Sequence, residues 1–421
     1  MVLLVLPLGS LISFLLVKYF RYGFILSWLL VLGVVTALFF LLEMSIFLRT
    51  ILYVLLPWGF VNLLYYVFIP NKEANTIDKK YRLVLQAKGS KVVLDNIRRG
   101  ISIIGAAGSG KTESVVHNLF RHFAANHFCG VMHDYKNFEI TEMAYPLFKG
   151  TDRKFHIVSF DPIHHRVNPI APRYLPDEES VHEISRVLLE NLLELKESGS
   201  SGTSRFFQDA VEGLIGGLIW RLKEDFPDYC TIPHMIALYQ FLDTAQLVRF
   251  LCADLTSKAM ADAFISGVDS DRQTAGVKST LANAFKKIST RKIFMALSAD
   301  EVSLDINNPK NPSVISIVNN PKTETSLSPI IATIIHTISK QMSERGRLTS
   351  FFLIEEASTI RLLNMHRVPA TLRSYDIATV YVLQDKIQND MLYGDKASKA
   401  ILGNLSYQFF GKANDPDTAK Y

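Results

Sequence analysis

The chain has 421 residues, 48% of them apolar and 20% charged, a balance that excludes an intrinsically disordered protein and a coiled coil. The formal net charge is +5, and the first seventy residues contribute +2 of it, so the remainder is nearly neutral and indicates no basic nucleic-acid surface. Cys129, Cys230 and Cys252 are widely spaced, as expected for reduced thiols in a cytoplasmic part.

Three apolar runs near the N-terminus lack charged side chains and are long enough, or nearly so, to cross about 30 Å of hydrocarbon. They are Met1–Val17, Tyr22–Leu42 and Thr50–Pro70. Lysine and arginine follow the first run and the third, which places both positions in the cytoplasm. We therefore expect the second run to cross outwards and the third to return, joined by an external turn around Glu43–Thr50. The first run is either a further span or a cleaved signal.

Beyond the anchor, short apolar runs alternate with helical patterns, which predicts a parallel sheet. The expected strands are Gly100–Ile104, Phe128–Met132, Lys154–Phe160, Ser313–Val318, Ser350–Ile354 and Ala378–Leu383. Asp134 and Asp161 follow two of these runs, as polar groups do at the carboxyl ends of buried strands. Ser114–Ala125 and Leu327–Met342 have helical spacing, and Ile77–Arg99 is expected to be a linker leading into small strands.

The stretch between Leu175 and Ile293 is different, because its periodic segments are nearly all helical. These segments are Val181–Leu195, Arg205–Lys223, His234–Leu242, Ala245–Cys252 and Gly276–Ile288. Glu197–Ser204, with the sequence ESGSSGTS, is expected to be a flexible loop among them. The fold class is therefore α/β with an inserted all-helical domain and an N-terminal transmembrane helical anchor.

One motif between a predicted strand and a predicted helix fits G-x-x-x-x-G-K-[ST], the phosphate-binding P-loop. Its residues expected to bind nucleotide are Gly105, Gly108, Ser109, Gly110, Lys111 and Thr112. Glycines let successive backbone N–H groups point at phosphate oxygens, and the helix N-terminus adds partial positive charge. We expect ATP here, with Lys111 on the β- and γ-phosphates and Thr112 on Mg²⁺.

A P-loop NTPase also needs acidic groups at the end of a neighbouring strand. Glu355 and Glu356 follow the apolar run Ser350–Ile354 and supply two. We assign Glu355 to the metal and Glu356 to activation of the attacking water; the alternative is a strand capped by two solvated acids. The usual first acid is aspartate, and contact with Mg²⁺ through water would absorb the extra methylene.

The domains expected are a transmembrane anchor over residues 1–70, the first part of a P-loop NTPase domain over 71–174, an all-α insertion over 175–292 and the second part of the NTPase domain over 293–421.

Several motifs in order resemble one family. They are the membrane hairpin, the P-loop, the helical insertion, FFLIEEAST, LRSYDIATV followed by LQDKIQ, Asp134-Tyr135-Lys136 and Asn168-Pro169-Ile170. Together they resemble the TraG/TraD-type coupling proteins of conjugation and type IV secretion, over roughly Gly100 to Tyr421. The resemblance implies a RecA-like ATPase, a homo-hexamer at the bacterial inner membrane with its ATPase domain in the cytoplasm. It implies single-stranded DNA carried by a relaxase, relaxosome proteins and type IV secretion channel components as partners.

Two further residues take roles only through this resemblance. Arg373 matches the family's arginine finger, which acts across a subunit boundary, and Gln384 matches a polar residue that senses the γ-phosphate. Each could instead be ordinary, Arg373 as a surface residue and Gln384 as a strand-end cap. Lys136 is either a phosphate or subunit contact or a solvated loop lysine.

Two alternative functions stay open. One is a membrane receptor that uses ATP only to assemble and dock substrate, with little hydrolysis because of Glu355; the other is a chromosome pump of the FtsK type. The sequence distinguishes neither a DNA cargo from a protein cargo nor one relaxase from another. The chain stops at Tyr421 within what looks like a continuing segment, Asn414–Tyr421, and the sequence leaves open whether it is a fragment.

Overall fold

The computed structural model describes residues 5–19, 23–68, 78–87, 89–193, 202–412 and Thr418. The chain divides into two compact units, Met1–Lys79 and Lys80–Tyr421. Apart from Thr418, the segment Asn414–Tyr421 lies outside the described residues, as does the predicted flexible loop up to residue 201. The last residues of that predicted loop are helical, since α8 begins at Gly202.

The N-terminal unit consists of apolar helices. They are α1 (Val5–Tyr19), α2 (Gly23–Leu41), α3 (Met44–Thr50), the π-helical turn η2 (Ile51–Leu55) and α4 (Leu56–Phe68). Two helical stretches, Gly23–Leu41 and Met44–Tyr65, are long and apolar enough to cross a membrane, whereas Leu6–Lys18 is shorter. The external turn predicted around Glu43–Thr50 is wrong in length, because Met44–Thr50 is already helical and only Leu42 and Glu43 make the turn.

Polar residues inside these helices find partners on neighbouring helices. The Ser27 hydroxyl donates to Asn62 Oδ1 at 2.6 Å, and the Trp58 indole N–H donates to the Ser13 hydroxyl at 3.1 Å. The π-turn ends at Leu55, two residues before Pro57, whose missing N–H would leave a carbonyl of a regular helix without its donor. Hydrogen bonds across helices and a local π-turn are how apolar helices accommodate such residues.

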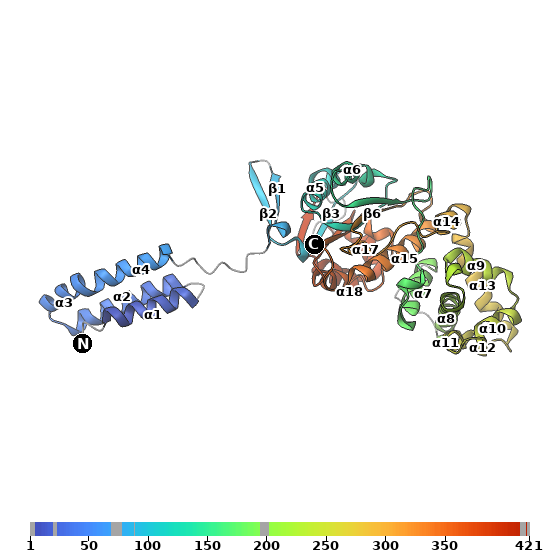
Figure 1. The fold of residues 1–421 in the computed structure, drawn as a ribbon, viewed down its shortest axis with the longest axis horizontal. Coiled ribbons are helices and arrows are strands. Elements are labelled where there is room, and N and C mark those ends of the chain that lie inside the picture. Colours follow the sequence, from blue (N-terminus) through green and yellow to red (C-terminus); the bar gives the residue numbers. More distant parts are fainter. Residues whose placement is uncertain are drawn as a thin grey trace. The chain divides into compact units, whose positions relative to one another are not determined.

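The second unit is built on a parallel sheet, which confirms the α/β class (Figure 1). Its strands are β3 (Ile101–Ile104), β4 (Cys129–Asp134), β5 (Lys154–Val158), β6 (Ser313–Val318), β7 (Ser350–Ile354), β8 (Ile377–Leu383) and β9 (Tyr407–Phe410). Among the described residues their order is β5-β6-β4-β7-β8-β3-β9, with every neighbouring pair parallel. The P-loop strand β3 is thus separated from the acid-bearing strand β7 by β8 alone.

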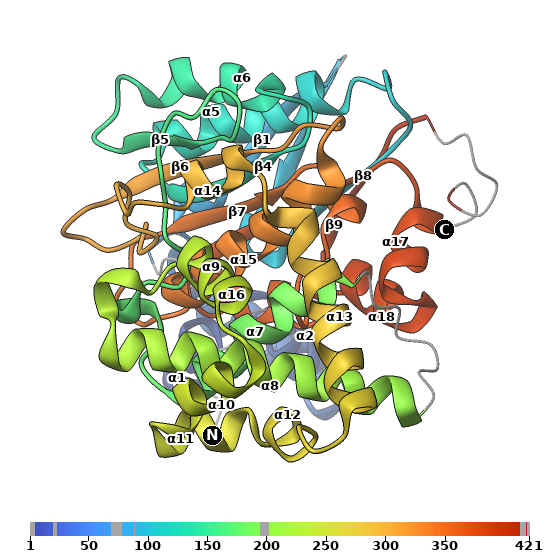
Figure 2. The same cartoon turned by 90° about the vertical axis from the view of Figure 1, so that its right-hand side faces the viewer.

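Helices cover both faces of this sheet (Figures 1 and 2). On one face lie α5 (His117–Ala125) with its leading π-turn η5 (Thr112–Val116), and α6 (Glu139–Phe148). On the other lies α15 (Glu324–Met342). Alternate strand residues join separate cores: Phe351 and Leu353 pack with α5, and Phe352 and Ile354 with α15. Burial on both faces explains why the central strands read as continuous apolar runs.

A small antiparallel hairpin precedes the sheet, formed by β1 (Leu83–Ala87) and β2 (Ser90–Leu94). Its inward residues Leu83, Leu85 and Leu94 are buried in the same core as α5. The predicted linker Ile77–Arg99 is therefore, from Lys80 onwards, part of the second compact unit.

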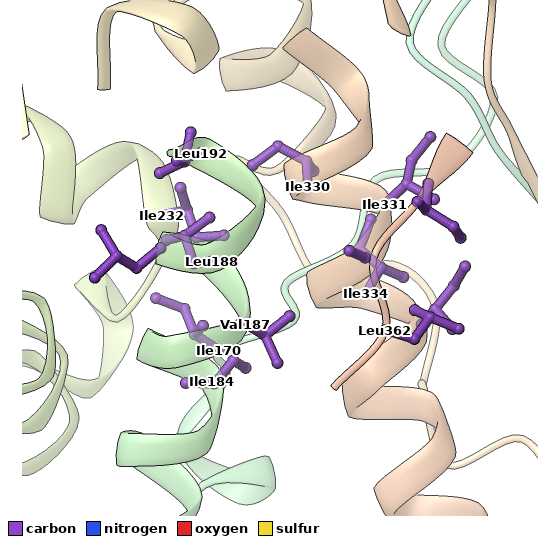
Figure 3. Packing of buried hydrophobic residues seen from close by; sticks show 14 of the residues in the cluster. Ile170, Ile184, Val187, Leu188, Leu192, Ile232, Ile330, Ile331, Ile334 and Leu362 are labelled. Atoms are coloured by element: carbon purple, nitrogen blue, oxygen red, sulfur yellow. The ribbon is translucent and has the colours of Figure 1, made fainter. Parts of the chain in front are cut away.

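The stretch predicted as a helical insertion contains helices and no strand among its described residues. They are α7 (Glu178–Leu192), α8 (Gly202–Asp225), α9 (Ile232–Phe241), α10 (Thr244–Cys252), α11 (Leu255–Met260), α12 (Asp262–Ser266), α13 (Asp271–Ile288) and α14 (Arg291–Ala296). Helix α7 joins this insertion to the sheet domain, since Val187 and Leu188 lie in one core with Ile330 and Ile334 of α15 (Figure 3). Near the C-terminus follow α16 (Val368–Arg373), α17 (Lys386–Tyr393) and α18 (Asp395–Gly403).

Candidate nucleotide-binding site

The loop after β3 adopts a backbone that requires glycine at two positions. Gly108 and Gly110 have φ values of +74° and +78°, a region that costs other residues about 1–2 kcal/mol. A helix begins directly at Thr112, so the loop ends at a helix N-terminus. The strand, loop and helix predicted from the sequence therefore occur in that order.

The loop is also braced by a strand that the sequence did not predict. Beyond β9, Gly411 N–H donates to the Ile104 carbonyl at 2.7 Å, and Ala106 N–H donates to the Lys412 carbonyl at 2.8 Å. A Cβ on Gly105 would lie 3.0 Å from the Gly411 Cα and 2.9 Å from the Ser109 hydroxyl oxygen. Gly105 is thus needed for close approach of two backbones.

Lys111 lies folded into the loop. Its ammonium donates to the carbonyl of Gly105 and, at 3.2 Å, to that of Ala106, and the residue is buried. Burial lowers the pKa of Lys111, and the nearby carboxylates of Glu356 and Glu355 oppose that shift. The acid pair is therefore close enough to the P-loop lysine to act on its charge, although the chain between them runs through the whole insertion.

Both predicted acids are buried at the carboxyl end of β7. Glu355 is 3% exposed and Glu356 is 2% exposed, so the alternative of two solvated acids is not what the structure has. Burial raises the pKa of Glu355 to about 7, while Lys136 lowers it. Glu356 has a φ of +46°, an unusual backbone for a residue with a side chain.

Lys136 spans the acid pair. Its ammonium lies 3.3 Å from Glu355 Oε1, 3.8 Å from Glu356 Oε1 and 3.5 Å from Glu139 Oε2. Burial alone would lower the pKa of Lys136, but these carboxylates raise it. Of the two roles left open for Lys136, a solvated loop lysine does not describe this residue, whose side chain is 35% exposed and bonded to the acids.

A buried polar network at the end of β4 supports the same acids. The His133 ring donates from Nδ1 to the Glu355 carbonyl at 2.8 Å, and its other nitrogen lies 3.4 Å from the Asn319 amide nitrogen. Burial lowers the pKa of His133 to about 4, so the ring is neutral. Asp134 accepts from the Thr141 backbone and hydroxyl, and burial raises its pKa. The strand-end position of Asp134 was visible in the sequence, whereas Asn319 follows β6 with no motif around it.

Gln384 directly follows β8, and its amide donates to Glu356 Oε1 at 3.1 Å. The structure thus brings Gln384, Glu356, Glu355 and Lys111 to one edge of the sheet, where the carboxyl ends of β3, β7 and β8 meet.

Arg373 lies at the opposite edge. It ends α16, just before β8 begins at Ile377, and β8 then runs seven residues, about 20 Å, to reach Gln384. The side chain is exposed, and among the described residues it has no hydrogen bond or ion pair. Arg373 is therefore too far away to act on a nucleotide held by its own P-loop.

The residues at the carboxyl edge suit a magnesium nucleotide. Across the described part of the chain there is no cluster of three or more His, Cys, Asp or Glu side chains that could hold a metal alone. Mg²⁺ usually keeps several waters and is bound by one or two side chains together with substrate phosphates. Thr112, Glu355 and the loop amides fit that pattern, and the buried Ser109 hydroxyl has no partner within the described structure.

One family model matches most of the chain. The sequence profile described as "Type IV secretory system Conjugative DNA transfer" matches residues 70–421. The fold is similar to the bacterial conjugative coupling protein TrwBdeltaN70 in its unbound form, with a TM-score of 0.61 and 14% identity over 78% of this chain and 72% of that one.

Two further solved structures are similar. The plasmid coupling protein TrwB in complex with ADP and Mg²⁺ has a TM-score of 0.61 and 14% identity, over 79% of this chain and 75% of that one. VirB4 of Thermoanaerobacter pseudethanolicus has a TM-score of 0.53 and 12% identity, over 82% and 88% respectively. At these identities the structural likeness establishes the fold. No match was found among curated proteins.

Proposed function

The chain belongs to the type IV secretory system conjugative DNA transfer family, and on that premise we propose that it is an ATP-hydrolysing coupling protein. It would recruit relaxase-bound single-stranded DNA, protein, or both, and drive this cargo into a secretion channel. The observation that carries the proposal is the meeting of the P-loop lysine, Glu356 and Gln384 at one edge of the sheet.

ATP would be held by the P-loop. Its ligands would be Gly105, Gly108, Ser109, Gly110, Lys111 and Thr112. The Lys111 ammonium now satisfies loop carbonyls and would exchange them for phosphate oxygens. The binding of ADP and Mg²⁺ by TrwB, which shares the fold, supports this assignment.

Hydrolysis needs an oriented water and stabilised phosphate charge. Mg²⁺, held by Thr112 and Glu355, would supply charge neutralisation on the phosphate oxygens. Glu356 would orient the water and accept its proton. The Gln384 amide donates a hydrogen bond to Oε1 of Glu356, which leaves Oε2 to bind that water. The same hydrogen bond links Glu356 to the end of β8.

Arg373 would act on a nucleotide bound by another copy of the chain. Its distance from its own P-loop and its lack of a partner in the described structure support action across a subunit boundary. A ring of copies, with six expected from the resemblance, would thus be required for turnover. The apolar helices α2 and the run Met44–Tyr65 would anchor each copy in the inner membrane with the sheet domain in the cytoplasm.

The test is ATP turnover by the purified full-length protein with and without single-stranded DNA. We expect DNA to stimulate turnover and Lys111→Ala to abolish it, while Lys399→Ala, an exposed lysine paired with Asp395, leaves it unchanged. DNA-independent turnover that survives Lys111→Ala would refute the motor function. A mating assay with Lys111→Ala in the parent element tests transfer itself.

One observation favours the docking receptor as second candidate. Lys136 occupies Glu355, so the acid assigned to Mg²⁺ must exchange a cationic partner before it can bind the ion. Nucleotide-dependent assembly without turnover would select the receptor. A variant that still conjugates but missegregates chromosomes would select the FtsK-type pump instead.

A further inference from the structure

The positive charge of the chain is concentrated in one short segment. Residues 78–99 contain seven lysines and arginines against Asp78 and Asp95, a net +5, which equals the formal net charge of the whole chain. The chain beyond this segment and beyond the apolar helices is therefore slightly acidic. An anionic partner is attracted to the second unit mainly here.

Several of these charges are exposed. Lys91 and Arg99 are exposed and their side chains have no partner in the described structure, and Arg82 makes only an exposed pair with Asp95 at 3.7 Å. They surround the β1–β2 hairpin, which begins fifteen residues after α4 ends at Phe68. The basic segment is thus the first described part of the chain after the apolar helices.

The outward face of the hairpin is apolar as well as basic. The strand register places Val84 opposite Val93 and Gln86 opposite Lys91. Val84 is 43% exposed and Val93 is 37% exposed, although valine is usually buried. Exposed valines beside lysines suit a membrane interface, where acyl chains meet phosphates, better than the polar and aromatic contacts that nucleic acids offer.

The hairpin is fixed to the sheet domain. Tyr81, Leu83 and Leu94 are buried in the core that includes α5, and the Arg98 guanidinium lies 3.8 Å from the Tyr81 ring centre and pairs with Asp376 just before β8. Whatever binds the hairpin therefore orients the whole sheet. The hairpin leads into β3 at its amino end, whereas the nucleotide site lies at the carboxyl end.

We propose that the outward face of the β1–β2 hairpin, with Arg82, Val84, Lys91 and Val93, binds the anionic phospholipid headgroups of the membrane that anchors the chain. This docking holds the amino edge of the sheet against the lipid and leaves the nucleotide edge open. It rests on the proposed membrane attachment and is independent of ATP turnover.

The experiment measures hydrogen–deuterium exchange of amides 83–94 in the full-length protein in nanodiscs. Discs of phosphatidylcholine alone are compared with discs containing a third phosphatidylglycerol. We expect exchange at least about threefold slower in the anionic discs, because each basic residue near an anionic surface adds to the free energy of membrane binding. We expect 0.5 M salt to abolish the difference, because it screens this attraction. Equal exchange in both discs overturns the proposal.

Variants identify the residues. Arg82→Glu/Lys91→Glu is expected to lose the slowing, whereas Lys396→Glu, an exposed lysine on α18, keeps it. An equal loss in both would mean a general charge effect and overturn the assignment. Slowing by a single-stranded oligonucleotide in phosphatidylcholine discs, with none from phosphatidylglycerol, would assign the hairpin to nucleic acid and likewise overturn it. The wild-type comparison between discs stands even if the double variant fails to fold.

Discussion

Replacement of Lys136 by methionine should change how strongly nucleotide binding depends on Mg²⁺. The Lys136 ammonium is 3.3 Å from Glu355 and 3.8 Å from Glu356, and both acids are buried. Without the ammonium, the negative charge of the acid pair faces the phosphates without the cation paired with it. Nucleotide that arrives without Mg²⁺ is then repelled, whereas nucleotide that carries Mg²⁺ brings its own compensating charge.

The size of the effect follows from the distance and the exposure. At 3.3 Å the direct attraction is about 5 kcal/mol for an effective dielectric constant of 20. The Lys136 side chain is 35% exposed, so water screens much of this, and about 1.5 kcal/mol is a realistic loss. We therefore expect Lys136→Met to weaken Mg²⁺-free binding about tenfold and Mg²⁺-bound binding by less than about threefold.

The assay is equilibrium binding of a fluorescent, non-hydrolysable ATP analogue with Mg²⁺ or with chelator, and the quantity compared is the ratio of the two dissociation constants. Glu139→Gln is the matched control, because it removes a carboxylate 3.5 Å from Lys136 but leaves the ammonium on the acid pair. That ratio should be unchanged in Glu139→Gln. If Lys136→Met weakens both forms of binding by the same factor, Lys136 has only a structural role and the reasoning is refuted.

Three further predictions concern other parts of the chain. Burial raises the pKa of Glu355 to about 7 from 4.5, so between these pH values the folded state holds a proton that the unfolded state has lost. The free energy of unfolding therefore falls as pH rises from about 4.5 to about 7. Glu355→Gln should abolish this dependence of stability on pH and raise the free energy of unfolding by about 2–3 kcal/mol above pH 7, measured by unfolding without metal. An unchanged pH dependence would contradict the assignment. Arg373→Ala and Lys111→Ala should each abolish ATPase activity when every copy carries the same change. Assemblies that mix the two variants should recover activity, because an intact P-loop in one copy then lies beside an intact Arg373 in the next. No recovery in verified mixed assemblies would exclude action across subunits. Ser27→Ala removes the donor to Asn62 and should destabilise the helices of the N-terminal unit by about 1 kcal/mol, seen as a lower Tm in detergent; an unchanged Tm would show the bond to be neutral.

The fold was predictable where a continuous apolar run marked a strand buried on both faces. The strands Ser313–Val318 and Ser350–Ile354 match β6 and β7 to the residue, because both are buried on two faces and bounded by polar groups. Strand β9 was not predicted, because Tyr407–Phe410 has only four residues and alternates between half-buried and exposed at the sheet edge. Helix α6 was not predicted, because Pro146 lies inside it and proline disfavours the interior of a helix.

The candidate site was predictable as a set of motifs but not as a network. The P-loop and the two glutamates each have a local signature, so the sequence could name them. The bond between Lys136 and Glu355 joins residues 219 positions apart, and it depends on β4 pairing with β7, a strand order that no local periodicity encodes. The sequence therefore left Lys136 between two roles, and the neighbouring strands decide its position.

The order of elements along the chain separates the two edges of the larger sheet. The apolar helices lead through the hairpin into β3, and β3 is only four residues long before the P-loop begins. Because all strands of the larger sheet are parallel, every strand start lies on the edge where the hairpin leads into β3, the entry edge, whereas Glu355, Glu356 and Gln384 follow strand ends on the opposite edge. Arg373 and the basic hairpin share the entry edge, which explains why neither can serve the nucleotide of its own chain. Contact with lipid through the hairpin would thus leave the acid pair and the P-loop free to meet nucleotide.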